Sequence, residues 1–421
     1  MTKKDFKRYM CRGHGRCYTH LQDGERIDKY KDIVLWGCLH NLAYDIQCEG
    51  TRAEYVYGLT KFFSDDEYFI LPAIKKLEEL PNNRHVYDEI SHLSGLLRRF
   101  AEDGSGEALS ALRKKRREYL EILMNKRSHR SYDFMRDYFE RISIDTIPLI
   151  DLSELVSDFG RLFINNKHYD MDEFDWFSIC LEDYYGAKRL SSILKKESKH
   201  NGEISAFYDS YLILKSDNAE HRPRRERREE SVEELTERLF SEEDPDKKAD
   251  ILFKVSFKEN IPESIHEKII EYAGSDNDKL SENALYALTY CQGDAVYSFA
   301  KSILNSDRKT EAIEMLLMNY HHEDKESLFE EIKKYKIDYR SQYDWHSVTA
   351  KIISVSDAGI PIPKEYLVYV YENILCSYCR KNVIKALAKR RWLTPGMIKE
   401  SQYDSNDETA GYIRRYYKKY L

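Results

Sequence analysis

The chain has 421 residues, with 67 basic and 74 acidic side chains and a formal net charge of −7 at pH 7. This length exceeds what one compact core usually accommodates, so it indicates two domains or one extended array. The acidic balance argues against a general nucleic-acid coat, and the low content of glycine (17) and proline (9) favours helices joined by short turns.

The first half of the chain predicts a succession of helices. Residues 3–10 form a short basic helix that ends in the loop Arg12-Gly-His-Gly-Arg16. The segment 32–44 is apolar on nearly all faces, which is typical of a helix buried between neighbours. Further helical patterns cover residues 55–63, 67–80, 87–100, 107–125, 131–142 and 151–163. Together they predict an N-terminal helical region, similar to a helical repeat, over residues 1–215.

A charge-dense stretch follows this region. Residues 222–230 read Arg-Pro-Arg-Arg-Glu-Arg-Arg-Glu-Glu, and almost no apolar residue lies near them. Such a composition is typical of a linker. We therefore expect a charged linker over residues 216–230 and a second helical domain over residues 231–421.

The segment 263–320 contains two similar helix pairs. In the second helix of the first pair, apolar residues fall at i, i+1, i+4 and i+7 and so share one face. These residues are Ala284, Leu285, Leu288 and Cys291. In the second helix of the second pair one face is formed at i, i+3, i+4 and i+7 by Ile313, Leu316, Leu317 and Tyr320. The turns at residues 275–278 and 306–307 begin alike and lie ~30 residues apart, within the range of helical repeats.

A first helix, an Asp-containing turn and a second helix with small and apolar core residues resemble HEAT-like α-solenoid repeats. The resemblance is clearest over about residues 263–320 and extends to residues 363–392. It implies an all-α fold, namely a curved solenoid of stacked antiparallel helical hairpins. Because solenoids offer large surfaces and few deep pockets, it also implies a non-catalytic scaffold protein that binds a protein partner on its concave surface.

Three features indicate the compartment. No apolar run is long enough to span a bilayer, and the first residues lack the apolar region of a signal peptide. The eight cysteines are scattered through predicted helices, as is typical of reduced thiols rather than a disulfide framework. We therefore expect a cytoplasmic protein without a membrane partner.

A cluster of charged residues near the N-terminus is the first candidate site. If the first helices pack as hairpins, their loops share one end, and Arg and His side chains there could hold a phosphate or a carboxylate. The candidate binding residues are Arg12, His14, Arg16, His40, Glu49 and Arg52. The alternative is a solvated loop with ordinary charges.

Two cysteine patterns could suggest metal or redox chemistry. Four ligands spaced three residues apart, Cys11, His14, Cys17 and His20, spiral around a helix and do not converge on one ion. The pair Cys376-Ser-Tyr-Cys379 precedes a repeat helix with no strand nearby, which favours two buried thiols over a redox motif. We therefore predict no metal and no cofactor, while an anion- or metal-binding site at the N-terminal Gly-rich loop stays the second alternative function.

Basic and aromatic residues also raise nucleic-acid binding as an alternative. The surface candidates are Trp345, Arg390, Arg391 and Trp392, and a basic run lies at residues 113–117. Some HEAT-like proteins are DNA glycosylases, which this chain resembles in repeat type only. The net charge argues against this alternative, and helix C-termini favour cations without any ligand. The sequence contains no P-loop, dinucleotide-binding, HExxH or GxSxG signature, which favours binding over catalysis.

Overall fold

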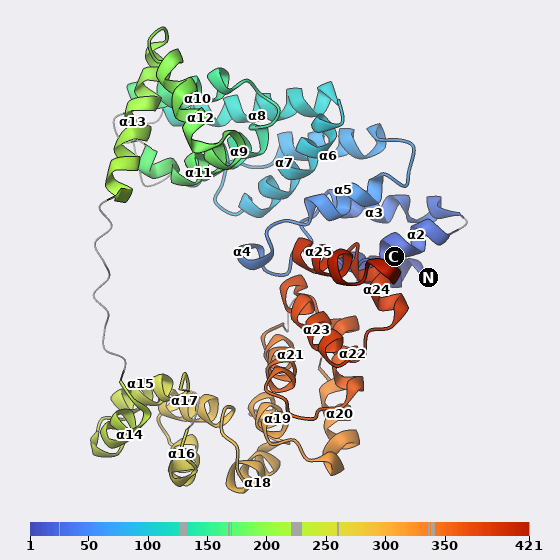
Figure 1. Ribbon diagram of the computed structural model, residues 1–421, viewed down its shortest axis with the longest axis vertical. Helices are drawn as coiled ribbons and strands as arrows, with labels where there is room; N and C mark the ends of the chain where they lie inside the picture. The colour runs from blue at the N-terminus through green and yellow to red at the C-terminus, as the bar shows by residue number, and fades with distance from the viewer. Residues whose placement is uncertain are drawn as a thin grey trace. The chain divides into compact units, whose positions relative to one another are not determined.

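The computed structural model describes residues 1–421 except residues 25, 126–132, 167–168, 170, 220–229, 259–260, 336, 338–341 and 421. Within the described residues the chain forms 25 α-helices and five short 3-10 helices, and no strand (Figure 1). This confirms the predicted all-α class. Among the same residues, no helix combines the length and the apolar character that crossing a bilayer requires.

The chain divides into two compact units. Unit 1 comprises Met1–Arg224 together with Lys399–Leu421, and unit 2 comprises Arg225–Ile398. The division falls within the predicted linker 216–230, of which residues 220–229 lie outside the described part. The second domain predicted for residues 231–421 differs at its end, because its last residues belong to unit 1.

Unit 1 is built around a series of antiparallel helices that follow one another in the chain. Its α-helices are α1 (Lys3–Cys11), α2 (Arg16–Asp23), α3 (Lys31–Cys38), α4 (Ile46–Glu49), α5 (Ala53–Thr60), α6 (Glu67–Glu79), α7 (Tyr87–Glu102), α8 (Gly106–Asn125), α9 (Asp133–Thr146), α10 (Leu152–Asn165), α11 (Asp175–Tyr185), α12 (Ala187–Glu197), α13 (Gly202–Ala219) and α25 (Asp407–Tyr416), and its 3-10 helices are η1 (Ile27–Tyr30), η2 (Met171–Phe174) and η5 (Lys418–Tyr420). The helix α7 packs against α5, α6, α8 and α9, and α10 packs against α13. A continuous core of buried apolar residues runs from Phe6 of α1 to Leu214 of α13.

One predicted helix is shorter than expected. The sequence predicts a helix over residues 32–44, but α3 ends at Cys38. The residues that follow have hydrogen-bond partners outside a helix: the Asn41 side chain accepts from the Ala43 N–H, and the Glu49 carboxylate accepts from Tyr44 and Asp45. Such side-chain acceptors compete with helical hydrogen bonds, and periodicity alone does not reveal them.

Unit 2 consists of helices in consecutive pairs. They are α14 (Val232–Ser241), α15 (Pro245–Val255), α16 (His266–Ala273), α17 (Asp278–Leu288), α18 (Asp294–Ile303), α19 (Lys309–Met318), α20 (Lys325–Lys333), α21 (Gln342–Asp357), α22 (Lys364–Asn373) and α23 (Ser377–Lys389), with η3 (Glu263–Ile265) and η4 (His322–Asp324) between them; α24 (Pro395–Ser401) contains the boundary with unit 1. The second helix of each pair packs against the second helix of the next, from α15 through α17, α19 and α21 to α23 (Figure 1).

The turns of unit 2 explain where its helices begin. The Asn277 side chain accepts from the Leu280 N–H at 2.8 Å and so caps the start of α17. Asp244 caps α15 in the same way, with Pro245 at the first helical position. These are the residue types that satisfy the unpaired N–H groups of a first turn. The helices α16 to α19 cover the segment 263–320 in which the sequence predicts two helix pairs.

Candidate functional site

The loop between α1 and α2 packs against the returning C-terminal segment, residues 399–421. Gly13 has a φ of +64°, and its carbonyl accepts a hydrogen bond from the Ser405 N–H at 2.9 Å. A Cβ atom on Gly13 would lie 2.0 Å from Ser405 Oγ, and one on Gly15 would lie 1.8 Å from the Glu400 carbonyl oxygen. The two glycines are therefore required by the close approach of this segment.

The arginine that ends this loop binds a carboxylate of the same chain. Arg16 Nε lies 2.7 Å from Glu400 Oε1, and Arg16 Nη2 lies 3.1 Å from Glu400 Oε2, so the pair is bidentate. A third donor, Arg16 Nη1, reaches the Tyr9 hydroxyl at 2.6 Å. His14 Nδ1 lies 4.0 Å from Glu400 Oε2, and the His14 carbonyl accepts from the Tyr55 hydroxyl at 2.8 Å. The carboxylate that this loop binds is therefore Glu400.

A second ion pair lies beneath the loop. Arg52 Nη2 lies 3.0 Å from Glu49 Oε1, and both side chains are buried. Arg52 also donates to the Cys11 carbonyl at the end of α1. Because the Glu49 carboxylate in turn holds backbone N–H groups before α4, this pair joins the first helices to one another. Its role is structural.

The remaining predicted residues of the cluster occupy different surroundings. Arg12 is buried in the same loop as Gly13. His40 stacks on Trp36 with a ring separation of 4.6 Å, and its Nδ1 lies 2.7 Å from the Trp36 carbonyl oxygen. The structure thus brings Arg16 and His14 together at Glu400, and pairs Arg52 with Glu49. It gives His40 a separate set of contacts.

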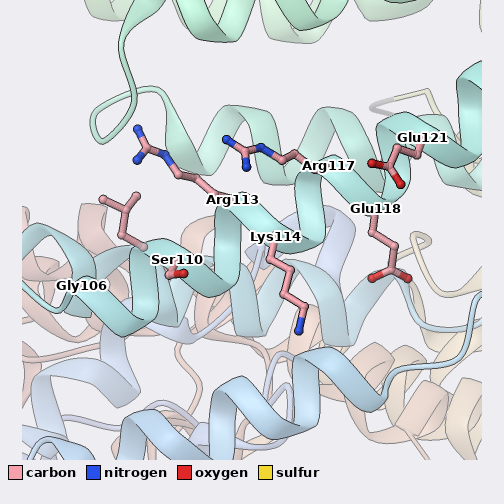
Figure 2. Close-up of a pocket in the computed structure, with 8 residues that line it drawn as sticks. Gly106, Ser110, Arg113, Lys114, Arg117, Glu118 and Glu121 are labelled. Carbon is pink, nitrogen blue, oxygen red and sulfur yellow. The ribbon is translucent and has the colours of Figure 1, made fainter.

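The basic run on α8 borders a pocket of about 600 Å³ (Figure 2). Figure 2 shows Arg113 and Arg117 on one side of the helix and Lys114 on the opposite side. Each of the five cations has a carboxylate partner: Arg113–Glu154 at 3.2 Å, Lys114–Glu78 at 2.7 Å, Lys115–Glu118 at 3.2 Å, Arg116–Asp158, and Arg117–Glu154 at 3.9 Å. These acids belong to α6, α8 and α10. Their negative charge neutralises the cations that would otherwise attract a phosphate.

The aromatic and basic candidates of unit 2 do not form a surface site. Trp345 is only 2% exposed, so it is a core residue and its prediction as a surface residue is wrong. Arg390 donates to the carbonyls of Ser356 and Ile360 at 2.8 and 3.3 Å and thereby caps the end of α21. The guanidinium of Arg390 also lies 5.3 Å from the Trp392 ring.

The same segment ends α23 in a Schellman motif. Arg391 adopts the left-handed conformation with a φ of 58°, and the Trp392 N–H donates to the Leu387 carbonyl at 2.8 Å. This pattern is how many helices satisfy their last carbonyl groups. Residues 390–392 therefore serve two helix ends.

A group of exposed aromatic rings in unit 2 was missed by the sequence analysis. Phe253 and Phe257, in and just after α15, are 47% and 64% exposed, and Tyr286 and Tyr290 of the following pair are 36% and 40% exposed. The ring centroids of Phe253 and Phe257 lie 4.9 Å apart, those of Phe253 and Tyr286 6.3 Å, and those of Tyr286 and Tyr290 5.3 Å. We call these four residues the aromatic face. The available signal was two aromatic pairs at i and i+4, which share one side of a helix.

A pocket of about 350 Å³ adjoins the aromatic face. It is lined by Tyr286, Tyr290, Glu314, His346, Ser347, Ala350, Lys351 and Ser354, from α17, α19 and α21. Its two charged groups are largely buried. Burial raises the pKa of Glu314, whose carboxylate accepts from the Ser347 hydroxyl. Burial lowers the pKa of Lys351, which donates to the Thr289 carbonyl at 2.8 Å and lies 4.0 Å from the Tyr290 ring.

This arrangement combines apolar contact area with two polar groups of opposite kind. Beside the tyrosine rings, Glu314 can accept a hydrogen bond and Lys351 can donate one. Such a combination suits a ligand with an apolar group next to an amide group. No protein-family model, curated protein or solved structure matches the chain.

Proposed function

We propose that the chain is a binding protein whose unit 2 is a HEAT-like stack of helical hairpins, and that this unit holds a protein partner on the aromatic face. Two features support the repeat assignment. The second helices of successive pairs pack on one another, and the segment 263–320 repeats its helix–turn–helix pattern. In such a stack the second helices share one side. The aromatic face and the adjoining pocket are built from residues in or just after the second helices α15, α17, α19 and α21.

The exposure of Phe253 and Phe257 is the observation that carries this proposal. Burying a phenylalanine ring is favourable by about 1.5–3 kcal/mol relative to leaving it in water. Two neighbouring phenylalanines that continue into two tyrosines are the kind of rigid apolar anchor that dominates protein interfaces. Tyrosine and phenylalanine are also enriched there relative to the rest of a protein surface.

A protein partner fits these residues better than a nucleic acid. Aromatic rings can stack on bases, but nucleic-acid binding also requires cations that meet the phosphates. The basic residues that could meet phosphates already have partners within the chain. The cations of residues 113–117 pair with carboxylates, and Arg390 caps the end of α21. The polar groups beside the rings, Glu314 and Lys351, match the amide groups of a peptide.

The test compares three baits in affinity capture from lysate, each with and without nuclease and at two salt concentrations. The baits are the wild-type chain, a Phe253→Ser/Phe257→Ser double variant, and a Trp176→Ser variant. Trp176 is 56% exposed on α11 of unit 1 and is the matched control for loss of a surface aromatic residue. All three baits are expected to fold alike, because the replaced side chains are exposed.

We expect a discrete protein band from the wild-type and Trp176→Ser baits that resists nuclease and is lost with the double variant. Two results would contradict the proposal. One is equal capture by all three baits, which would place binding elsewhere. The other is recovery of nucleic acid that falls steeply with salt.

A further inference from the structure

Three potential metal ligands converge at the start of α23. His346 of α21 places its Nε2 3.2 Å from Cys379 Sγ, although 33 residues separate the two in the chain. Cys376 is the N-cap of α23, and its sulfur accepts the Cys379 N–H at 3.4 Å. The three ligand atoms lie within 4.8 Å of one another. One helix end and one neighbouring helix thus supply two sulfurs and one imidazole nitrogen.

The chemistry of this donor set is specific. Thiolate and imidazole are the ligands that bind Zn²⁺, whereas Mg²⁺ and Ca²⁺ prefer oxygen. A tetrahedral Zn²⁺ ion with Zn–S bonds of about 2.3 Å holds its ligand atoms roughly 3.5–3.8 Å apart. The separation of 3.2 Å between His346 Nε2 and Cys379 Sγ, and the limit of 4.8 Å within which all three ligand atoms lie, bracket this range. A sulfur at a helix N-terminus is also favoured as a thiolate by the helix dipole.

We propose that His346, Cys376 and Cys379 bind one Zn²⁺ ion. Cys376-Ser-Tyr-Cys379 was predicted to be two buried thiols because it precedes a repeat helix with no strand nearby, and the structure places His346 beside the pair. On binding, each thiol loses its proton to solvent as its Zn–S bond forms, so one Zn²⁺ displaces up to two protons. These residues provide three ligands, and water or a group from a ligand completes the tetrahedron.

The site would join α21 to α23, which already pack against each other. His346 also lines the pocket beside the aromatic face, so the ion would lie next to that pocket. The proposal goes beyond the proposed function and does not depend on it. Its test uses the metal alone, and its outcome is unaffected by whether the aromatic face binds a partner.

The experiment measures Zn²⁺ binding to the full chain after reduction and removal of metal. Isothermal titration in two buffers of different ionisation enthalpy gives the stoichiometry, the affinity and the number of protons released. Co²⁺ serves as a spectroscopic probe, because thiolate coordination produces a ligand-to-metal charge-transfer band. We expect one equivalent of Zn²⁺, proton release, the Co²⁺–thiolate band, and no competition by excess Mg²⁺.

The ligands are tested with Cys376→Ser, Cys379→Ser and His346→Gln. Serine is itself a good N-cap, so Cys376→Ser keeps the start of α23 while removing the sulfur. Loss of an outer-shell partner typically weakens a metal site by about 10–100-fold, and we expect each ligand variant to exceed the upper end of that range. The control Cys48→Ser removes an exposed thiol of unit 1 and should leave binding unchanged.

The Zn²⁺ titration of the wild-type chain tests the proposal even if a ligand variant fails to fold. Absence of Zn²⁺ binding by the reduced wild-type chain would overturn the proposal outright. Retention of full affinity in the folded Cys379→Ser or His346→Gln variant would overturn it as well, because the ion would then be held elsewhere.

Discussion

Arg16 Nε and Glu400 Oε1 lie 2.7 Å apart, although 384 residues separate the two side chains in sequence. Two further contacts join the same two chain segments, α2 and residues 399–403. The Tyr18 and Tyr403 rings stack at 5.2 Å, and Lys399 pairs with Asp23 at 3.0 Å. The last 23 residues therefore belong to the fold of the first helices, and unit 2 is an insertion between the two chain segments of unit 1.

The first prediction concerns the energy of this ion pair. A bidentate, partly buried pair between charged groups is expected to contribute about 1.5–3 kcal/mol. A double-mutant cycle with Arg16→Ala and Glu400→Gln, measured as the free energy of unfolding of unit 1, should give a coupling energy near the lower end of that range. The exposed pair Lys399–Asp23 is the control, with an expected coupling of about 0.5 kcal/mol or less. Equal couplings in the two cycles would contradict this account.

The second prediction concerns the glycines of the loop. Gly15→Ala places a methyl group on the Glu400 backbone, so the C-terminal segment must move away. We expect faster hydrogen–deuterium exchange in residues 399–421 and a loss of about 2–4 kcal/mol in the stability of unit 1. Gly106→Ala is the matched control, because nothing lies within 4 Å of the added methyl group. An unchanged exchange rate in Gly15→Ala would show that the segment is not held against this loop.

The third prediction compares two acids of α10. Asp158 pairs with Arg116, whose guanidinium is almost completely buried, whereas Glu154 pairs with the more exposed Arg113 and Arg117. Asp158→Asn leaves a buried cation without its counter-charge and should cost about 3–5 kcal/mol. Glu154→Gln should cost about 1 kcal/mol or less. Chemical denaturation gives the free energy of unfolding of each variant. A larger loss of stability in Glu154→Gln than in Asp158→Asn would show that the Arg116–Asp158 pair is not buried as described.

The fourth prediction is a pH dependence from Glu140. Burial raises the pKa of this carboxyl from its ordinary value of 4.5 to about 7, although its oxygen accepts the Phe177 N–H at 2.9 Å. Because the folded pKa is above the unfolded one, the stabilising contribution is complete below pH 4.5 and is lost as pH rises towards 7. By linkage, at roughly 1.4 kcal/mol per pKa unit, the loss is at most about 3 kcal/mol.

Glu140→Gln tests this effect, because glutamine keeps an acceptor for the Phe177 N–H and carries no charge. We expect the variant to match the wild-type stability near pH 4.5 and to exceed it increasingly up to pH 7. Burial lowers the pKa of His92 to about 4, so this residue makes stability rise with pH over part of the same range. Both proteins contain His92, and its effect therefore cancels in their comparison. A stability difference that stays constant between pH 4.5 and 7 would mean that Glu140 does not titrate in this range.

The helices were predictable from the sequence because their apolar spacing and turn residues are local. The pattern over residues 263–320 corresponds to α16 through α19, and Asn277 marks a helix start as its residue type suggests. The early end of α3 was not predictable from periodicity, because it depends on side-chain acceptors such as Glu49.

The candidate sites were predictable only in part, because they depend on distant contacts. Arg16 and His14 were identified as a group that could bind a carboxylate. Their partner Glu400 carries no local signal among 74 acidic residues. Gly13 and Gly15 gave the one local signal, because two glycines in a three-residue span are typical of a close backbone approach. His346 was missed for the same reason as Glu400, since nothing near it in sequence indicates Cys379.

The most direct test of the proposed function is photo-crosslinking in cells from single positions of the chain. A photoreactive benzoylphenylalanine in place of Phe257, which is 64% exposed, probes the aromatic face. The same residue in place of Trp176, which is 56% exposed, probes a position of unit 1. We predict a discrete covalent adduct with a protein from position 257 and no such adduct from position 176. No protein adduct from position 257, or an adduct with nucleic acid, would contradict the assignment of the aromatic face as a protein-binding surface.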